Sequence, residues 1–187
     1  VGSEMCIRDR PKILEVTLNN GVDPVSGRKV GLETGDPRGF GNYDELYAAF
    51  MKQVRYFVDM KVRVSNYIDR MFAKYAPATF LSLFIDDCIA KGRDYYNCGP
   101  RYNTTYIQCT GLGTITDSLA TLKKHIFEDK RWSMDELLKA MADNFEGAEA
   151  MRQTILNRTP FFGNDDEYAD SIAVKVFCLL YTSPSPR

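Results

Sequence analysis

Residues 95–110 read YYNCGPRYNTTYIQCT, and this stretch decides the fold class that the sequence predicts. It is rich in Tyr, Thr and Ile, which favour extended chain, and glycines flank it at Gly92 and Gly111. The pattern predicts a β-strand. Because a single strand is not stable alone, we expect its sheet partners to lie outside the chain printed here.

On both sides of this strand the sequence predicts helices. Apolar residues recur at intervals of three and four from Asp44 to Pro77, which predicts one helix of about thirty residues. Ser133 and Glu136 form a capping box that predicts a helix start. The glycine-rich stretch 22–42 is predicted to be a loop. The expected class is therefore α/β, mostly helical, with further helices over residues 11–18, 79–91, 112–128, 134–144, 148–158 and 165–177.

The two ends of the chain read differently from the rest. Residues 1–10 (VGSEMCIRDR) and 178–187 (CLLYTSPSPR) can both be back-translated into a single library adapter, read on opposite strands. We therefore expect both ends to be adapter-derived, with residues 11–177 an internal piece of a longer protein. Both ends should then pack poorly, and apolar faces of the piece should be exposed. Burial of Leu179, Leu180 and Tyr181 would count against this interpretation.

The composition excludes several classes of function. The chain has 24 basic and 25 acidic residues and a net charge of −1, which argues against binding to nucleic acid or to a membrane surface. No apolar run approaches the roughly 18–20 residues that span a bilayer. The three cysteines between the end segments, Cys88, Cys98 and Cys109, are unevenly spaced. They are expected to be reduced thiols in a cytoplasmic protein, because a disulfide framework is typical of secreted chains.

Two motifs resemble ligand sites but have simpler explanations. Gly111-Leu-Gly113 precedes a predicted helix, as in a phosphate-binding turn, but Thr116 stands where a third glycine would be. A tight turn from strand to helix is the preferred interpretation. The cysteines form no C-x-x-C pair and the only histidine is His125, so a zinc site is not expected and buried or half-buried thiols are.

Acidic and amidic residues give weaker signals. Asp86-Asp87 lies within a predicted helix, and residues 164–167 (NDDE) stand at the start of another. Carboxylates favour the positive end of the helix dipole, so capping is preferred to metal binding. Asn103-Thr-Thr105 and Asn157-Arg-Thr159 match glycosylation sequons, which have no role in a cytoplasmic chain.

Several stretches, in order, resemble the pyruvate formate-lyase-like domain of glycyl radical enzymes, and the resemblance spans residues 11–177. The stretches are LEVTLNNG (14–21), FLSLFIDDCIAKGRD (80–94), GPRYNTTYIQ (99–108), GLGTITDSL (111–119), NFEG (144–147) and GNDDEY (163–168). The resemblance implies a slice of a ten-stranded α/β barrel with helices outside. It is most similar to the trans-4-hydroxy-L-proline dehydratase branch, with glycerol and propanediol dehydratases, formate acetyltransferase, and choline and sulfonate lyases as alternatives.

The resemblance also implies the chemistry of the whole protein. In such enzymes a glycyl radical, in an R-V-x-G-Y-like motif, takes a hydrogen atom from a cysteine thiol. The resulting thiyl radical then abstracts a hydrogen atom from the substrate. The cysteine lies in a G-C-x-E-like motif, where the Glu is a general acid and base. A separate radical S-adenosylmethionine activating enzyme installs the radical. The implied partners are therefore this enzyme, a small hydroxylated substrate and a second copy in a homodimer, with no nucleic acid and no membrane.

Neither loop occurs in this chain. Cys88 precedes Ile89, Cys98 precedes Gly99 and Cys109 precedes Thr110, so none fits G-C-x-E. No catalytic, cofactor-binding or metal-ligating residue is therefore assigned, and the fragment alone is expected to be inactive.

The polar residues of the predicted strand are Arg101, Asn103, Thr105 and Gln108. Alternate side chains could face a substrate cavity, but structural hydrogen bonds are the preferred role. A non-catalytic helical interaction module is the alternative in a different class, and the orphan strand argues against it.

Overall fold

The computed structural model describes the backbone of residues 9–102 and 110–181. The chain divides into two compact units, and each is described by itself. The first unit contains residues 1–57 and 108–183, and the second contains residues 58–107 with the last four residues. The side chains of Leu179, Leu180 and Tyr181 lie outside the described part, so the expectation about their burial stays a prediction.

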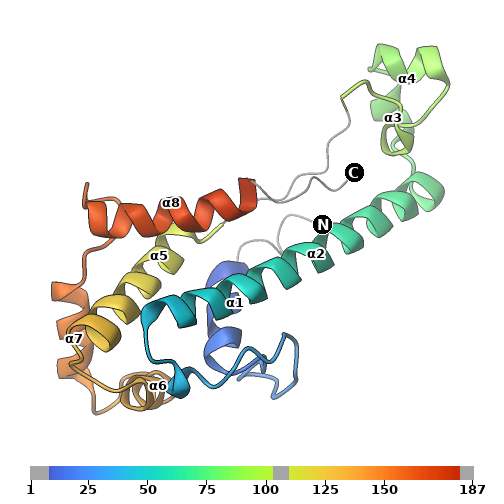
Figure 1. Ribbon diagram of the computed structural model, residues 1–187. Helices are drawn as coiled ribbons and strands as arrows, with labels where there is room; N and C mark the ends of the chain where they lie inside the picture. The colour runs from blue at the N-terminus through green and yellow to red at the C-terminus, as the bar shows by residue number, and fades with distance from the viewer. Residues whose placement is uncertain (1–8, 103–109, 182–187) are drawn as a thin grey trace. The chain divides into compact units, whose positions relative to one another are not determined.

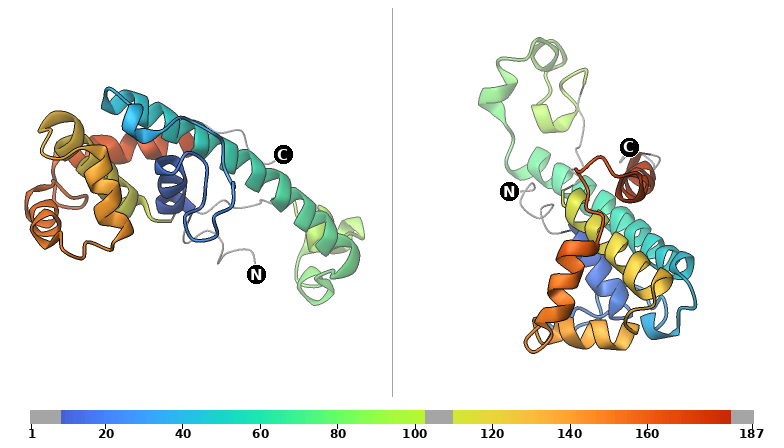
Figure 2. Two further views of the ribbon diagram at one scale, coloured as in Figure 1. Left: turned by 90° about the horizontal axis from the view of Figure 1, so that it is seen from below. Right: turned by 90° about the vertical axis from the view of Figure 1, so that its left-hand side faces the viewer.

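In the first unit helices pack against one another (Figures 1 and 2). Their buried apolar side chains form its core. α5 (Leu112–Thr121) packs against α8 (Glu167–Tyr181) and against α1 (Asp9–Leu18). The buried residues of α8 follow one helical face at intervals of three and four. They are Ala169, Ile172, Ala173 and Val176.

The start of α2 (Tyr43–Tyr75) belongs to the same unit, and its buried residues also recur mainly at intervals of three and four. Leu46, Ala49, Phe50, Gln53 and Val54 are its buried residues. The long helix predicted from Asp44 is thus confirmed. Residues 22–42 are irregular apart from a short 3₁₀ turn, η2 (Pro37–Gly39), and an isolated antiparallel bridge between Val22 and Lys29.

The predicted helix over residues 112–128 is confirmed, but its second half has a different hydrogen-bonding pattern. After α5 the chain continues as a π-helix, η4 (Leu122–Glu128), with the amide of Asp129 bonded to the carbonyl of Lys124 at 2.7 Å. α6 (Met134–Ala142) begins at the predicted capping box, and α7 (Glu149–Arg158) follows.

The second unit contains the end of α2, α3 (Thr79–Ser82), α4 (Asp86–Lys91) and a 3₁₀ turn, η3 (Tyr95–Asn97). The prediction of one helix over 79–91 is wrong. The Ser82 hydroxyl accepts a hydrogen bond from the Tyr95 amide at 2.9 Å and Ile85 is extended, so the helix stops and restarts.

The predicted strand is also wrong wherever the structure describes it. Residues 95–97 form η3, Cys98 has a left-handed backbone with φ of 57°, and no strand occurs among the described residues. Residues 103–109 lie outside the described part. Gly99 explains why this segment is compact, because a Cβ there would lie 2.5 Å from both the Arg93 carbonyl oxygen and the Cys88 sulfur.

Candidate functional site: the π-helical segment and its surroundings

Of the four polar residues of the predicted strand, Arg101 lies in the described part of the structure. Arg101 is exposed, and its backbone N–H donates to Asp87 Oδ2 at 3.0 Å. Its guanidinium donates to Asp87 Oδ1 at 3.3 Å. This contact ties the segment to α4, as the structural interpretation predicts. Asn103, Thr105 and Gln108 lie outside the described residues.

The structure describes two of the three cysteines between the end segments. Cys88 is buried against Gly99, whereas Cys98 is exposed. Cys109 lies outside the described residues. Over the ranges that the structure describes, no group of three metal-ligating side chains comes together.

The glycine and acidic motifs have local structural roles. Gly111 is the N-cap of α5 with φ of 77°, and a Cβ there would lie 3.0 Å from Pro11 Cδ. A tight turn against α1 therefore accounts for this glycine. Asp86 and Asp87 stand in the first turn of α4, where carboxylates favour the positive end of the helix dipole.

α8 begins at Glu167, two residues after the predicted start at Asp165. Asp165 has a left-handed backbone, and Asp166 accepts from the Tyr168 amide at 2.9 Å. Asp166, not Asn164, therefore caps this helix.

The π-helix joins two buried polar side chains of the first unit, His125 and Thr159. His125 is only 1% exposed, and its Nε2 lies 3.0 Å from the Thr159 hydroxyl. Its Nδ1 is buried without a hydrogen-bond partner, and its ring lies 5.4 Å from that of Trp132. Burial lowers the pKa of His125 below its ordinary value. The imidazole is therefore neutral, and it links the π-helix to the connection that follows α7.

A second cluster lies on the α8 side of the π-helix. The Tyr168 hydroxyl donates to Glu128 Oε2 at 2.9 Å, and Lys123 Nζ stands 4.1 Å from the centre of the Tyr168 ring. Burial is the main cause that raises the pKa of Tyr168, and the hydrogen bond to Glu128 raises it further. Burial also raises the pKa of Tyr43, whose ring meets Phe127 edge-on at 6.3 Å. Both phenols therefore stay protonated; Tyr168 donates a hydrogen bond, and the ring of Tyr43 packs against Phe127.

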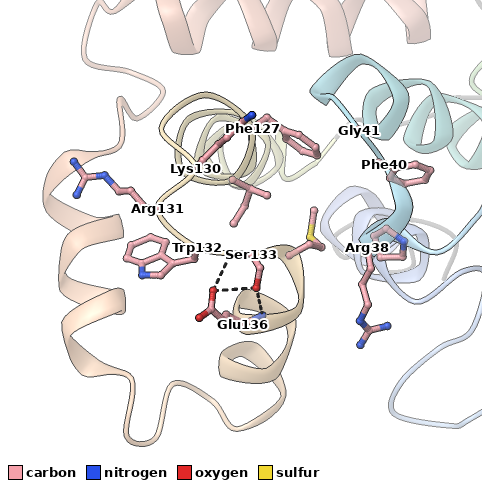
Figure 3. Close-up of a pocket in the computed structure, with 12 residues that line it drawn as sticks. Arg38, Phe40, Gly41, Phe127, Lys130, Arg131, Trp132, Ser133 and Glu136 are labelled. Atoms are coloured by element: carbon pink, nitrogen blue, oxygen red, sulfur yellow. Dashed lines mark hydrogen bonds between the residues drawn. The ribbon is translucent and has the colours of Figure 1, made fainter.

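An open pocket of about 450 Å³ lies beside these clusters, between η2 and the start of α6 (Figure 3). Its walls include Phe40, Phe127 and Trp132, with Lys130 and Arg131 beside them. The charges that line it are mostly paired. Arg38 bonds to Asp135 at 2.7 Å, Arg131 bonds to Asp129 at 3.2 Å, and Glu136 completes the capping box with Ser133.

The paired charges and the aromatic rings of this arrangement hold helices in position. The pocket lining contains no cysteine and no histidine. His125 is buried behind it, and its one bonded partner is a threonine hydroxyl. Sequence reasoning did not find the His125–Thr159 contact, because a lone histidine on a helix face gives no signal of its own. The sequence marks Thr159 only as the last residue of the glycosylation sequon that begins at Asn157.

Comparison with known proteins assigns the fold to a family. The description "Pyruvate formate lyase-like" matches residues 4–183, nearly the whole chain. The chain belongs to this family. The trans-4-hydroxy-L-proline dehydratase of Clostridioides difficile is 50% identical over 177 residues, which are 95% of this chain and 22% of that protein. The chain thus spans about a fifth of the length of the curated relatives that it matches.

Solved structures of the pyruvate formate lyase-like family agree with this assignment. The hydroxyproline dehydratase of C. difficile, solved with trans-4-hydroxy-L-proline bound, superposes with a TM-score of 0.86 at 51% identity. The match covers 92% of this chain and 22% of that one. The B12-independent glycerol dehydratase of Clostridium butyricum, in its glycerol-bound form, gives 0.84 at 31% identity over 95% of this chain and 23% of its own. The helices of this chain therefore have the fold of a segment of these two dehydratases.

Proposed function

We propose that this chain is a structural segment of a glycyl radical C–O lyase, a dehydratase that acts on a small hydroxylated substrate. The observation that carries the proposal is the 50% identity to the trans-4-hydroxy-L-proline dehydratase over 95% of the chain. The glycerol dehydratase has nearly the same fold at only 31% identity, so likeness of sequence favours the hydroxyproline branch. The substrate proposed is therefore trans-4-hydroxy-L-proline or a close relative of it.

The residues of this chain do not fit the radical chemistry itself. Cys88 is buried against a glycine, and Cys98 is exposed in a left-handed turn. Neither has a neighbouring carboxylate in a G-C-x-E sequence. No catalytic step is therefore assigned to them, and the proposed role of the segment is to form part of the wall of the ten-stranded barrel. Such a wall keeps water away from a reactive intermediate.

The whole protein is proposed to depend on partners outside this chain. A radical S-adenosylmethionine activating enzyme would install the glycyl radical, and the lyase would act as a homodimer in an oxygen-free cytoplasm. Over the ranges that the structure describes, no helix has the length and apolar character needed to cross a bilayer.

The test begins with the source DNA around the codons for residues 11–177. The reading frame should contain a G-C-x-E loop upstream and an R-V-x-G-Y motif downstream. The full protein, expressed without oxygen with its activating enzyme, should show a glycyl radical by electron paramagnetic resonance. It should then dehydrate trans-4-hydroxy-L-proline at least about tenfold faster than glycerol or propane-1,2-diol, a difference of roughly 1.4 kcal/mol in barrier.

Each failure has a separate meaning. A radical with faster turnover of glycerol or propane-1,2-diol would reject the hydroxyproline branch and keep the lyase. A reading frame without either loop would reject the radical lyase altogether, and would leave a non-catalytic protein of the same family.

A further inference from the structure

The open pocket beside the π-helix contains one positive charge that no carboxylate neutralises. Lys130 lines this pocket, whose volume of about 450 Å³ is within the range of small-molecule sites. Lys130 is exposed, and it forms no ion pair with any residue that the structure describes. The other two cations of the lining are paired, Arg38 with Asp135 at 2.7 Å and Arg131 with Asp129 at 3.2 Å. The unbalanced charge of the pocket is therefore that of Lys130.

The backbone holds Lys130 at the pocket in an uncommon conformation. Its φ is 48°, in the left-handed region that Gly, Asn and Asp occupy most readily. The Asp129 amide bonds to the Lys124 carbonyl at 2.7 Å on one side, and the Arg131 amide bonds to the His125 carbonyl at 2.9 Å on the other. The turn after the π-helix therefore fixes the point from which the Lys130 side chain extends.

Aromatic rings lie on two sides of the same pocket. Figure 3 shows Trp132 across the pocket from Phe127 and Phe40. The Trp132 ring lies 5.4 Å from the ring of the buried His125, which is itself bonded to Thr159. Buried groups therefore support Trp132 from behind. Faces and edges of this kind are suited to a flat apolar ring.

The negative charge of the pocket is already in use. Among the described lining residues Glu136 is the one carboxylate, and its Oε2 accepts from the Ser133 amide at 2.7 Å and from the Ser133 hydroxyl at 2.9 Å. This carboxylate lies at the N-terminus of α6, where a phosphate would otherwise bind, and it repels a second anion there. A single free cation beside apolar rings therefore favours a monoanion over a phosphate or a diphosphate.

We propose that this pocket binds a small monocarboxylate with a flat apolar ring, of which benzoate is the simplest example. The Lys130 ammonium pairs with the carboxylate, and the rings of Trp132, Phe127 and Phe40 contact the ring of the ligand. The proposal goes beyond the proposed function and does not depend on it. Every residue that carries it belongs to the first unit.

The test is isothermal titration calorimetry on the full-length protein that contains this chain, without activation. The probes are benzoate and its uncharged analogue benzamide. Benzoate should bind with a Kd of about 1 mM or tighter, and benzamide at least about tenfold more weakly. Acetate, which has the charge without the ring, should also bind at least about tenfold more weakly than benzoate.

Variants of Lys130 locate the binding in this pocket. Lys130→Asn removes the charge but keeps a residue that tolerates the left-handed backbone. It should weaken benzoate binding at least about tenfold, whereas Lys130→Arg should keep the affinity within about threefold. The matched control is Lys139→Gln on α6, an exposed lysine outside the pocket lining, which should leave the affinity unchanged.

The rings are tested separately by Phe40→Leu, which keeps an apolar side chain but removes the flat face. This variant should weaken benzoate binding about three- to tenfold. The thermal unfolding midpoint of each variant is measured alongside, and Lys130→Asn and Lys130→Arg should unfold at the same temperature as the unsubstituted protein.

Four results would overturn the proposal. Absence of benzoate binding would show that the pocket takes no such ligand, and equal binding of benzoate and benzamide would show that charge has no part in it. Unchanged affinity in Lys130→Asn would place the bound benzoate elsewhere in the protein. Equal losses in Lys130→Asn and Lys139→Gln would show a general effect of charge. The titration needs neither a radical nor turnover, so this proposal and the proposed dehydratase activity fail separately.

Discussion

At the residue scale, the buried amide of Gln53 connects the long loop to the helical core. Gln53 is 0% exposed, its Oε1 accepts from the Leu32 amide at 3.0 Å, and its Nε2 donates to the Leu32 carbonyl. Gly31 allows this approach, since a Cβ there would lie 2.6 Å from Gln53 Oε1. One side chain therefore satisfies both backbone groups of a loop residue, where secondary structure would otherwise do so.

Replacing Gln53 should release this loop. We expect Gln53→Leu to cost about 1–3 kcal/mol, because the backbone groups of Leu32 lose their partners. Hydrogen exchange of residues 22–42 should become about 5- to 150-fold faster. The control is Gln153→Leu on α7, whose side chain bonds to Glu149 and Asn157 at an exposed site, and which should change stability by less than about 0.5 kcal/mol. Equal exchange in both variants would contradict this role.

The neutral state of His125 makes the stability of the first unit depend on pH. Burial lowers its pKa in the folded chain, so the unfolded chain binds the proton more readily. Stability should be full above the unfolded pKa of about 6.5. It should fall below that pH by at most about 1.4 kcal/mol per pH unit. Urea unfolding between pH 7.5 and 5.5 measures this slope.

The matched variant that tests this pH dependence of the unfolding free energy is His125→Gln. Its side chain can still bond to Thr159 but cannot be protonated. Because His125 is the only histidine, the slope between these pH values should disappear in the variant. A slope that persists in His125→Gln would assign the pH dependence to carboxylates instead. Asp129, Arg131 and Lys124 are the charged groups that act on the ring.

At the element scale, α6 depends on its capping box. Ser133 Oγ accepts from the Glu136 amide at 3.2 Å, and Glu136 Oε2 accepts from the Ser133 amide at 2.7 Å. Ser133→Ala should cost about 0.5–2 kcal/mol in urea unfolding. Ser118→Ala, within α5, removes only a bond to the Thr114 carbonyl and should be neutral or slightly stabilising. If both variants unfolded alike, the cap would have no measurable role.

Signals that are local in sequence predicted these elements well. The capping box at Ser133, the spacing of apolar residues in α2 and the glycine before α5 each act within a few residues, so the sequence predicted them correctly. The predicted helix breaks after Ser82, whose hydroxyl accepts from the Tyr95 amide thirteen residues away, and the chain at Tyr95 forms a 3₁₀ turn rather than a strand. No local pattern distinguishes the π-helix around His125 from the α-helix before it.

For the candidate site, too, local sequence signals were predictive and contacts between distant residues were not. The motif order predicted the family, which the match over residues 4–183 confirms. The contacts that organise the first unit join residues far apart in the chain, such as His125 with Thr159 and Gln53 with Leu32. Sequence periodicity shows that such residues lie on a helix, but not which polar partner each one meets.

At the scale of the whole molecule, the first unit is built from two stretches of chain with the second unit inserted between them. α1 packs against α5, Tyr43 meets Phe127, and Arg38 bonds to Asp135 at 2.7 Å. These contacts join residues 9–57 to residues 110–178 without the intervening chain. The described core is concentrated in this unit.

A chain cut within the second unit should therefore keep its first unit intact. Brief chymotrypsin treatment should cut first at Phe80, Phe84 or Tyr102, which are 71–85% exposed, and spare Phe50, which is fully buried. The two remaining pieces should elute together in size-exclusion chromatography and separate only in denaturant, because the core still joins them. Leu119→Asp places an unpaired charge in that core, so its nicked pieces should separate without denaturant. Separation of the pieces from the unsubstituted chain under native conditions would show that the second unit is needed to hold the first together.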